Sequence, residues 1–353
     1  MERRVHTAGG GANGDPLRTV DYALVTLTGF AALMALTDGV GTPCVLPDGR
    51  PAVQMLSAVK TVTATLPPIE QQLVQYGSTD LELLPTLKQM AQELGAYTRT
   101  TQRATDVHGA DVARRSFLQL YGWELACTGP DTYALRSFWE WQSNGSLLKY
   151  LVRCLDQSNF PLGRTCFVAA LQEALQLLHV LSRAGIVLGD LKLENMLVDE
   201  HGHVKLSDVD GAGLLDASLL YATQAVAQQA AVQAAAACLD PCAAAAAVWS
   251  AADRLFAEEA PYMVTDAYMP LEMSAYGVMC AASHQHLLGA SLGQLLGAVQ
   301  PLLLAAPGRE VCWALVTELR VLATGMQTPA HTDRPDLPCV WAQLEGIRAR
   351  WAV

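Results

Sequence analysis

The chain has 353 residues, a hydrophobic content of 51% and a formal net charge of −11 at pH 7. This length is enough for two lobes that each bury a substantial core. The acidic balance argues against a nucleic-acid partner, because phosphate backbones are bound by basic surfaces. The nine cysteines are scattered, and the one close pair, Cys238 and Cys242, has no histidine partner, so a zinc site is not expected.

The first 20 residues are predicted to be a flexible tail. Its glycines, Gly9, Gly11 and Gly14, have the spacing of a phosphate-binding loop, but no strand precedes them. The apolar stretch Tyr22–Leu36 is short for a membrane-spanning helix, which needs about 20 apolar residues, and it makes a poor signal peptide. We therefore expect no transmembrane segment, and the absence of a clear signal peptide favours a cytoplasmic location.

Strand and turn signals follow the tail. Tyr22–Leu36 has the character of a strand, a turn at Gly29 and a second strand. Asp48-Gly49 is a hairpin turn signal, and Pro51–Leu56 is expected to be a short third strand. A helix should come next, because Thr79–Glu82 forms a capping box ahead of apolar residues at helical spacing.

The middle of the chain continues this alternation. Tyr133–Leu151 indicates a strand, a turn and a helix. Leu162–Ala184 carries apolar residues at helical spacing and is predicted to be a long buried helix. His179 on this helix is expected to pack or cap rather than to act in catalysis.

The most informative stretch is Ile186–Gly213. Within it, Met196–Val198 and Val204–Leu206 are short apolar runs separated by a turn signal, which predicts a β-hairpin. The polar residues Asn195 and Asp208 stand on either side of this hairpin. Polar residues in register across a hairpin are unlikely to arise by chance and indicate a functional site.

The sequence Asp190-x-Lys192-x-x-Asn195 followed by Asp208 resembles the catalytic loop and metal-binding segment of the protein kinase superfamily. The resemblance implies an α+β, bilobal fold with a small β-rich N-lobe and a helical C-lobe. It also implies ATP and Mg²⁺ as cofactors, and transfer of the γ-phosphoryl group to Ser, Thr or Tyr of a protein substrate. Asp190 would orient the acceptor hydroxyl and Lys192 would steady the γ-phosphate. Asn195 and Asp208 would hold Mg²⁺, and Asp210 would assist the metal.

The resemblance also implies a nucleotide site in the preceding lobe. Gly29 remains of the glycine-rich loop, and Gln54 stands where the lysine of the third strand is expected. Lys60 could replace this lysine only if the chain bends back, because a continued strand of about 3.3 Å per residue would carry it roughly 20 Å away. Glu82 and Glu93 are candidate partners of the lysine, and without it either is expected to be a solvated charge.

A hinge is implied at Glu140, Trp141 and Gln142, whose backbone would pair with adenine. The expected division of the chain is a tail at 1–20, an N-lobe at 21–139, a C-lobe at 140–340 and a second tail at 341–353.

The C-lobe should contain an Ala- and Gln-rich insertion at about 222–260, loosely helical because alanine is the best helix former. Further on, Glu272 fits two kinase landmarks that exclude each other, the Pro-Glu anchor and the next buried helix. Two amphipathic helices are predicted at 286–304 and 311–325.

The motif departs from the kinase pattern in two places. Leu188-Gly189 replaces the usual His-Arg, and Asp208-Val209-Asp210 replaces Asp-Phe-Gly. These features resemble the divergent secretory-pathway kinases of the lonesome-kinase type, which phosphorylate tyrosine and imply a secretory location. Gly-Asp-Leu-x-x-x-Asn also resembles aminoglycoside- and choline-kinase-type phosphotransferases, but Lys192 favours the protein kinases.

Two alternatives to an active protein kinase stay open. A pseudokinase that serves as a binding scaffold is favoured by Gln54, the thin glycine loop and Gly189. The retained Asp190, Lys192, Asn195 and Asp208 favour catalysis instead. A small-molecule phosphotransferase is the second alternative.

Overall fold

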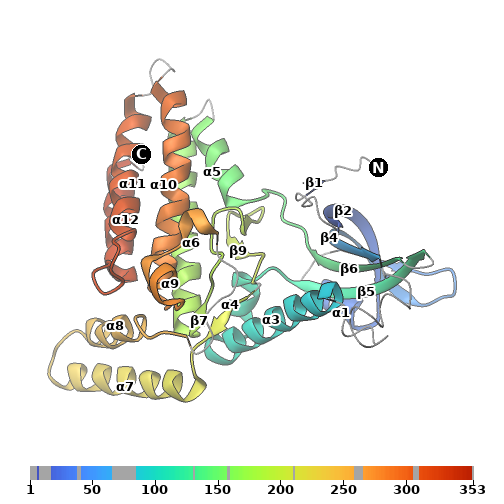
Figure 1. Cartoon of the computed structure of the whole chain (residues 1–353), viewed down its shortest axis with the longest axis horizontal. Helices are drawn as coiled ribbons and strands as arrows, with labels where there is room; N and C mark the ends of the chain where they lie inside the picture. The colour runs from blue at the N-terminus through green and yellow to red at the C-terminus, as the bar shows by residue number, and fades with distance from the viewer. Residues whose placement is uncertain are drawn as a thin grey trace. The chain divides into compact units, whose positions relative to one another are not determined.

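The computed structural model describes residues 6–7, 17–37, 41–65, 85–129, 132–156, 160–209, 211–257, 265–304 and 310–351. The chain forms two compact units, here called unit 1 (Met1–Leu94 with Leu118–Trp141) and unit 2 (Gly95–Phe117 with Gln142–Val353). Unit 1 carries a small antiparallel sheet, and unit 2 is mostly helical (Figure 1). The fold is therefore α+β, as predicted, and it is compatible with a bilobal kinase-like architecture.

The sheet of unit 1 has six strands, all paired antiparallel. In pairing order they are β1 (His6–Thr7), β2 (Leu17–Thr28), β4 (Pro51–Thr65), β6 (Thr132–Glu140) and β5 (Leu120–Gly129), with β3 (Thr42–Val45) paired to β4. The predicted turn at Asp48-Gly49 is confirmed, because the Leu46 N–H donates to the Arg50 carbonyl at 2.9 Å and Gly49 has a φ of 85°. This turn joins β3 to β4.

The second strand predicted within Tyr22–Leu36 is wrong, because β2 ends at Thr28 and helix α1 (Gly29–Thr37) follows. The residues of α1 are mainly Ala, Leu and Met, which are strong helix formers. A short apolar run does not by itself distinguish a helix from a strand. Ala32 and Ala35, one helical turn apart, are buried in the core of unit 1, and this packing favours the helix.

The third strand was expected to end at Leu56, and this is also wrong, because β4 continues to Thr65. Every residue from Val59 to Thr63 except Lys60 is Val or Thr, the β-branched types that favour strands. β4 lies between β2 and β6 and pairs with both, so its backbone groups are satisfied on both sides. Lys60 therefore lies inside a central strand and not in a bend.

Unit 2 is built around a helical core. The helices of this core are α5 (Leu147–Asp156), α6 (Phe160–Arg183), α10 (Ser283–Leu304), α11 (Glu310–Met326) and α12 (Leu337–Trp351). The predicted buried helix at Leu162–Ala184 is confirmed by α6, and the helices predicted at 286–304 and 311–325 are confirmed by α10 and α11. These helices contribute most of the buried side chains of unit 2.

Two further helices lie close to the division between the units in the sequence, α3 (Pro85–His108) and α4 (Ala110–Ser116). The division falls within α3, between Leu94 and Gly95. The expected capping box at Thr79–Glu82, including the candidate Glu82, lies outside the described residues.

Within the described part of the chain, one helical stretch is long and apolar enough to cross a membrane, Gly163–Arg183 of α6. However, 67% of this stretch is buried inside the protein. Its apolar character is explained by its place in the core, so the structure gives no clear transmembrane segment.

The Ala- and Gln-rich insertion forms two regular helices, α7 (Ala217–Ala236) and α8 (Pro241–Ala252). Each helix begins at an aspartate cap: Asp216 accepts the Leu219 N–H, and Asp240 accepts the Cys242 N–H, both at 2.8 Å. The helices pack against each other, and we call the pair the alanine-rich hairpin. The expectation of loose helicity understated its order.

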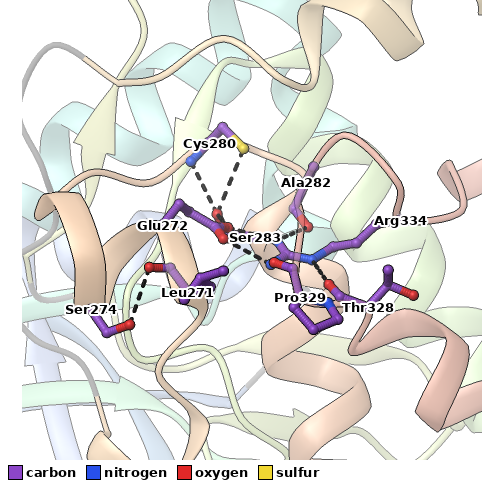
Figure 2. A network of polar contacts seen from close by, with 9 residues as sticks. All are labelled: Leu271, Glu272, Ser274, Cys280, Ala282, Ser283, Thr328, Pro329 and Arg334. Carbon is purple, nitrogen blue, oxygen red and sulfur yellow. Dashed lines mark hydrogen bonds and ion pairs between the residues drawn. The ribbon is translucent and has the colours of Figure 1, made fainter.

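A buried ion pair fixes the segment between this hairpin and the C-terminal helices (Figure 2). Glu272 lies in the short helix α9 (Leu271–Tyr276) and not in α10, so its interpretation as part of the next buried helix is wrong, and the Pro-Glu anchor stays a prediction. Its two carboxylate oxygens accept from Arg334 Nη1 at 2.6 Å and Nη2 at 2.8 Å, and the Ser283 hydroxyl also donates to it. The side chains are only 3% and 1% exposed.

The environment keeps Glu272 ionised. Burial alone would raise the pKa of its carboxyl, but the hydrogen bonds from Arg334 and Ser283 outweigh burial and hold the pKa below its ordinary value. Because the folded-state pKa is lowered, the pair stabilises the fold above the ordinary pKa of glutamate. That stabilisation is lost as the pH falls through the lowered value.

We predict that Arg334→Met destabilises the protein by roughly 3–5 kcal/mol, because it leaves the Glu272 carboxylate buried without its cation. The free energy of unfolding from urea titration measures this. Arg350→Met is the matched control, since Arg350 pairs with Glu318 on the surface of unit 2 at 58% exposure, and an exposed pair contributes little to stability. Equal losses in the two variants would contradict the prediction.

Candidate active site

The loop that contains the predicted catalytic residues is held between short strands in unit 2. On one side, β7 (Ile186–Val187) pairs with β10 (Gly213–Leu214). On the other, β8 (Met196–Val198) and β9 (Val204–Leu206) form the predicted hairpin, which is confirmed. The residues between β7 and β8, here called the catalytic loop, are therefore fixed at both ends.

Apolar and polar side chains alternate along the catalytic loop. Leu188, Leu191 and Leu193 are at most 2% exposed and belong to the core of unit 2. Asp190 and Lys192, which lie between them, keep side-chain exposures of 22% and 23%. The buried leucines anchor the backbone, so the two charged side chains are presented at fixed positions.

Three side chains, those of Lys192, Asn195 and Thr265, meet around the Asp190 carboxylate. Lys192 Nζ lies 3.0 Å from Oδ1 and 2.8 Å from Oδ2. Asn195 Nδ2 donates to Oδ2 at 3.0 Å and to the Asp190 carbonyl at 2.9 Å. The Thr265 hydroxyl donates to Oδ1 and accepts from Lys192 Nζ at 3.1 Å. The structure thus brings together three predicted residues and one that the sequence analysis missed.

This cluster determines the charge of Asp190. Partial burial alone would raise the pKa of the carboxyl, but the hydrogen bonds from Lys192, Thr265 and Asn195 and the Lys192 charge outweigh burial. The pKa of Asp190 is therefore held below its ordinary value. At neutral pH the group is a carboxylate that accepts hydrogen bonds.

The hairpin places the two predicted Mg²⁺ ligands at one of its ends. The Ser207 N–H donates to the Asn195 carbonyl at 2.9 Å, so Asp208 follows directly after the residue that pairs with Asn195. An amide oxygen and a carboxylate are donors that Mg²⁺ prefers, and it completes its shell with phosphate oxygens and water. No group of three or more His, Cys, Asp or Glu in the described residues is arranged to hold a metal. Asp210 lies outside the described residues.

Two side chains of α10 support the catalytic loop from behind. The Leu188 N–H donates to His284 Nε2 at 2.9 Å, and the Leu193 N–H donates to Ser291 Oγ at 3.1 Å. Burial lowers the pKa of His284 to about 4, so the imidazole is neutral and its Nε2 can accept. Neither contact could be predicted from the sequence, because the partners lie 96 and 98 positions apart.

In unit 1, Lys60 of β4 forms an ion pair with Glu93 of α3, with Nζ 2.7 Å from Oε2. The chain does not bend back between Gln54 and Lys60, because both lie in the regular strand β4. The expectation that Glu93 is a solvated charge is also wrong, since its side chain is 13% exposed and paired. A lysine on a central strand paired with a helix glutamate is the arrangement that protein kinases need for phosphoryl transfer.

Gln54 and Gly29 lie in other surroundings than predicted. Gln54 is exposed on β4 and pairs in the sheet with Thr26 and Thr42. Lys60, six residues further along the same strand, makes the ion pair with Glu93, and the assignment of the lysine position to Gln54 stays a prediction. Gly29 has a φ of 60° and begins α1, so it does not form a turn between two strands.

The predicted hinge residues lie at the end of β6. The Glu140 N–H donates to the Gln119 carbonyl at 2.8 Å, and the Gln142 carbonyl accepts from Gly145 at 3.2 Å. The Trp141 ring packs against Tyr22, with ring centroids 5.0 Å apart. Two of the backbone groups expected to pair with adenine are thus already bonded, and the division between the units falls directly after Trp141.

Comparisons with known proteins give partial matches. No family model matches the chain. It is 44% identical over 66 residues to G protein-coupled receptor kinase 4 of Mus musculus and of Rattus norvegicus, which covers 19% of this chain and 11% of each relative. It is 42% identical over 66 residues to protein kinase C delta type of Homo sapiens, which covers 18% of this chain and 9% of that relative.

The chain thus spans about a tenth of the length of these relatives. Each of these relatives is a protein kinase by name, and the fold of this chain is α+β with a small antiparallel sheet and a helical remainder. These findings support a relationship of the chain to the protein kinase superfamily.

Proposed function

We propose that the chain is an ATP-dependent protein kinase that transfers the γ-phosphoryl group to a Ser, Thr or Tyr hydroxyl of a protein substrate. The observation that carries this proposal is the cluster of Lys192, Asn195 and Thr265 around the ionised Asp190 carboxylate. Phosphoryl transfer is catalysed mainly by positioning and charge stabilisation, and this cluster provides both.

Each member of the cluster has a role that its contacts support. The Asp190 carboxylate accepts the hydrogen bond of the acceptor hydroxyl and orients its oxygen. Lys192 keeps a positive charge beside this carboxylate, where it can stabilise negative charge on the transferred group. Asn195 and Asp208 would hold Mg²⁺, which neutralises charge on the phosphate oxygens when bound.

The contacts in unit 1 support an active protein over a scaffold. The scaffold alternative rested on Gln54 at the position of the strand lysine, on the thin glycine loop and on Gly189, and the ion pair of Lys60 with Glu93 offers a lysine in place of Gln54. The helix that begins at Gly29 in place of a glycine-rich turn, together with Gly189, still favours a scaffold. A small-molecule phosphotransferase and a tyrosine-specific relative of the lonesome-kinase type differ from this proposal only in the acceptor.

We predict that the wild-type chain transfers phosphate from γ-labelled ATP to a peptide library containing Ser, Thr and Tyr, and that Asp190→Asn does not. Lys60→Met should lower kcat/KM by roughly 100-fold or more, because a cation that stabilises the transition state is lost. Gln54→Ala is the matched control on the same strand and should stay within about twofold, as an exposed substitution does.

Equal losses of kcat/KM for Lys60→Met and Gln54→Ala would show that Lys60 does not take the role of the strand lysine. Transfer to small hydroxyl compounds but to no peptide would support the small-molecule alternative. If neither peptides nor small hydroxyl compounds accept phosphate, the pseudokinase scaffold is the interpretation that remains.

Thr265→Val should lower kcat about tenfold or more, because hydrogen bonds to charged groups contribute roughly 1.5–3 kcal/mol. The Thr265 hydrogen bond helps to lower the pKa of Asp190, so its loss should raise that pKa and shift the acid limb of the kcat/KM profile to higher pH. Thr265→Ser keeps the hydroxyl and should retain the wild-type profile. Matching profiles for the Val and Ser variants would show that the hydroxyl has no part in catalysis.

A further inference from the structure

The alanine-rich hairpin is tied into unit 2 by more than apolar packing. In α7, the buried residues Leu220, Ala227 and Ala234 repeat every two helical turns and form one face. No charged residue occurs between Asp216 and Asp240. Polar contacts to the rest of unit 2 are instead concentrated at the end of α8.

The end of α8 carries a buried carboxylate. Asp253 is 5% exposed, its Oδ1 accepts from the Ser182 hydroxyl, and it lies 3.8 Å from Arg183 Nη1. The Arg183 guanidinium also lies 4.3 Å from the centre of the Trp249 ring of α8. The backbone carbonyl of Asp253 accepts from the Ala282 N–H at 2.8 Å.

These contacts form a closed ring around the start of the catalytic loop. Ser182 is near the end of α6, and the chain runs from it through β7 to Leu188. The Leu188 N–H donates to His284, which lies two residues after Ala282. Ala282 in turn donates to Asp253. Asp253, directly after α8, therefore bonds two segments that meet at Leu188. One begins at Ser182 and runs through β7 to Leu188, and the other contains Ala282 and His284, the hydrogen-bond partner of Leu188.

A hairpin with no role in the site would need only apolar contacts with unit 2. Burying a carboxylate such as that of Asp253 costs stability unless it is hydrogen-bonded. Asp253 Oδ1 is bonded, but Oδ2 is buried with no hydrogen-bond partner among the described residues, so the group depends on the few contacts that it makes and restricts the positions of their partners. We propose that the alanine-rich hairpin is a positioning element of the active site, and that Asp253 sets the position of the catalytic loop through Ser182 and Ala282. The catalytic consequence rests on the proposed kinase function, while the structural coupling does not.

The test is hydrogen exchange of the Leu188 amide in the full-length chain, which requires no activity. Asp253→Ala should speed exchange at Leu188 by about tenfold, within the range by which coupled residues modulate a distant site. Exchange at Leu319, buried in α11, should not change, and this separates local coupling from global destabilisation. Asp240→Ala is the matched control, because Asp240 caps α8, and among the described residues its side chain bonds only to the Cys242 and Ala243 N–H groups of that helix.

If Asp253→Ala does not fold, Ser182→Ala gives the same comparison, since it removes only the hydroxyl donor. Wild-type exchange at Leu188 in the folded variant, or equal acceleration in Asp240→Ala, would overturn the proposal. In the phosphoryl-transfer assay, Asp253→Ala should lower kcat while the KM for ATP stays unchanged, as expected of a positioning residue. An inactive wild type with faster Leu188 exchange in Asp253→Ala would reject the kinase function and keep the coupling.

Discussion

The candidate active site depends on keeping one half-buried carboxylate ionised in one orientation. Burial opposes the charge on Asp190, and three donors from Lys192, Asn195 and Thr265 overcome that opposition. Because each donor also restricts the rotation of the carboxylate, the same contacts set its charge and its direction. Phosphoryl transfer requires a positioned carboxylate of this kind, because the protein contributes mainly positioning and charge stabilisation and little covalent chemistry.

The rest of unit 2 holds the backbone beneath this carboxylate. The leucines of the catalytic loop are in the core, and two of its N–H groups donate to His284 and Ser291 of α10. Glu272 precedes α10 in the chain and accepts from Ser283, the first residue of α10, while its partner Arg334 lies between α11 and α12. The ion pair therefore holds the start of the helix that supports the loop. Stability and the proposed catalysis therefore rest on the same elements in this unit.

Much of the fold follows from local sequence patterns, and the failures have physical reasons. The β8–β9 hairpin and the buried helix α6 were predictable because their apolar spacing and turn residues act over short distances. The helix after Gly29 was missed because a short apolar run fits either structure, and tertiary packing decides. The ion pair of Lys60 with Glu93 was not predicted, because the third strand was expected to end at Leu56 and β4 continues to Thr65. Thr265, His284 and Arg334 could not be found, since their partners are distant in the sequence and only the fold brings them together.

If Asn195 and Asp208 hold Mg²⁺ with ATP as proposed, the melting temperature of the purified chain will rise when both are added. With ATP at about 100 times its dissociation constant, binding should stabilise the wild type by about 2.7 kcal/mol. The account predicts this shift only when Mg²⁺ is also present, and predicts its loss in Asp208→Asn. No shift at millimolar ATP, or the same shift in Asp208→Asn, would contradict it.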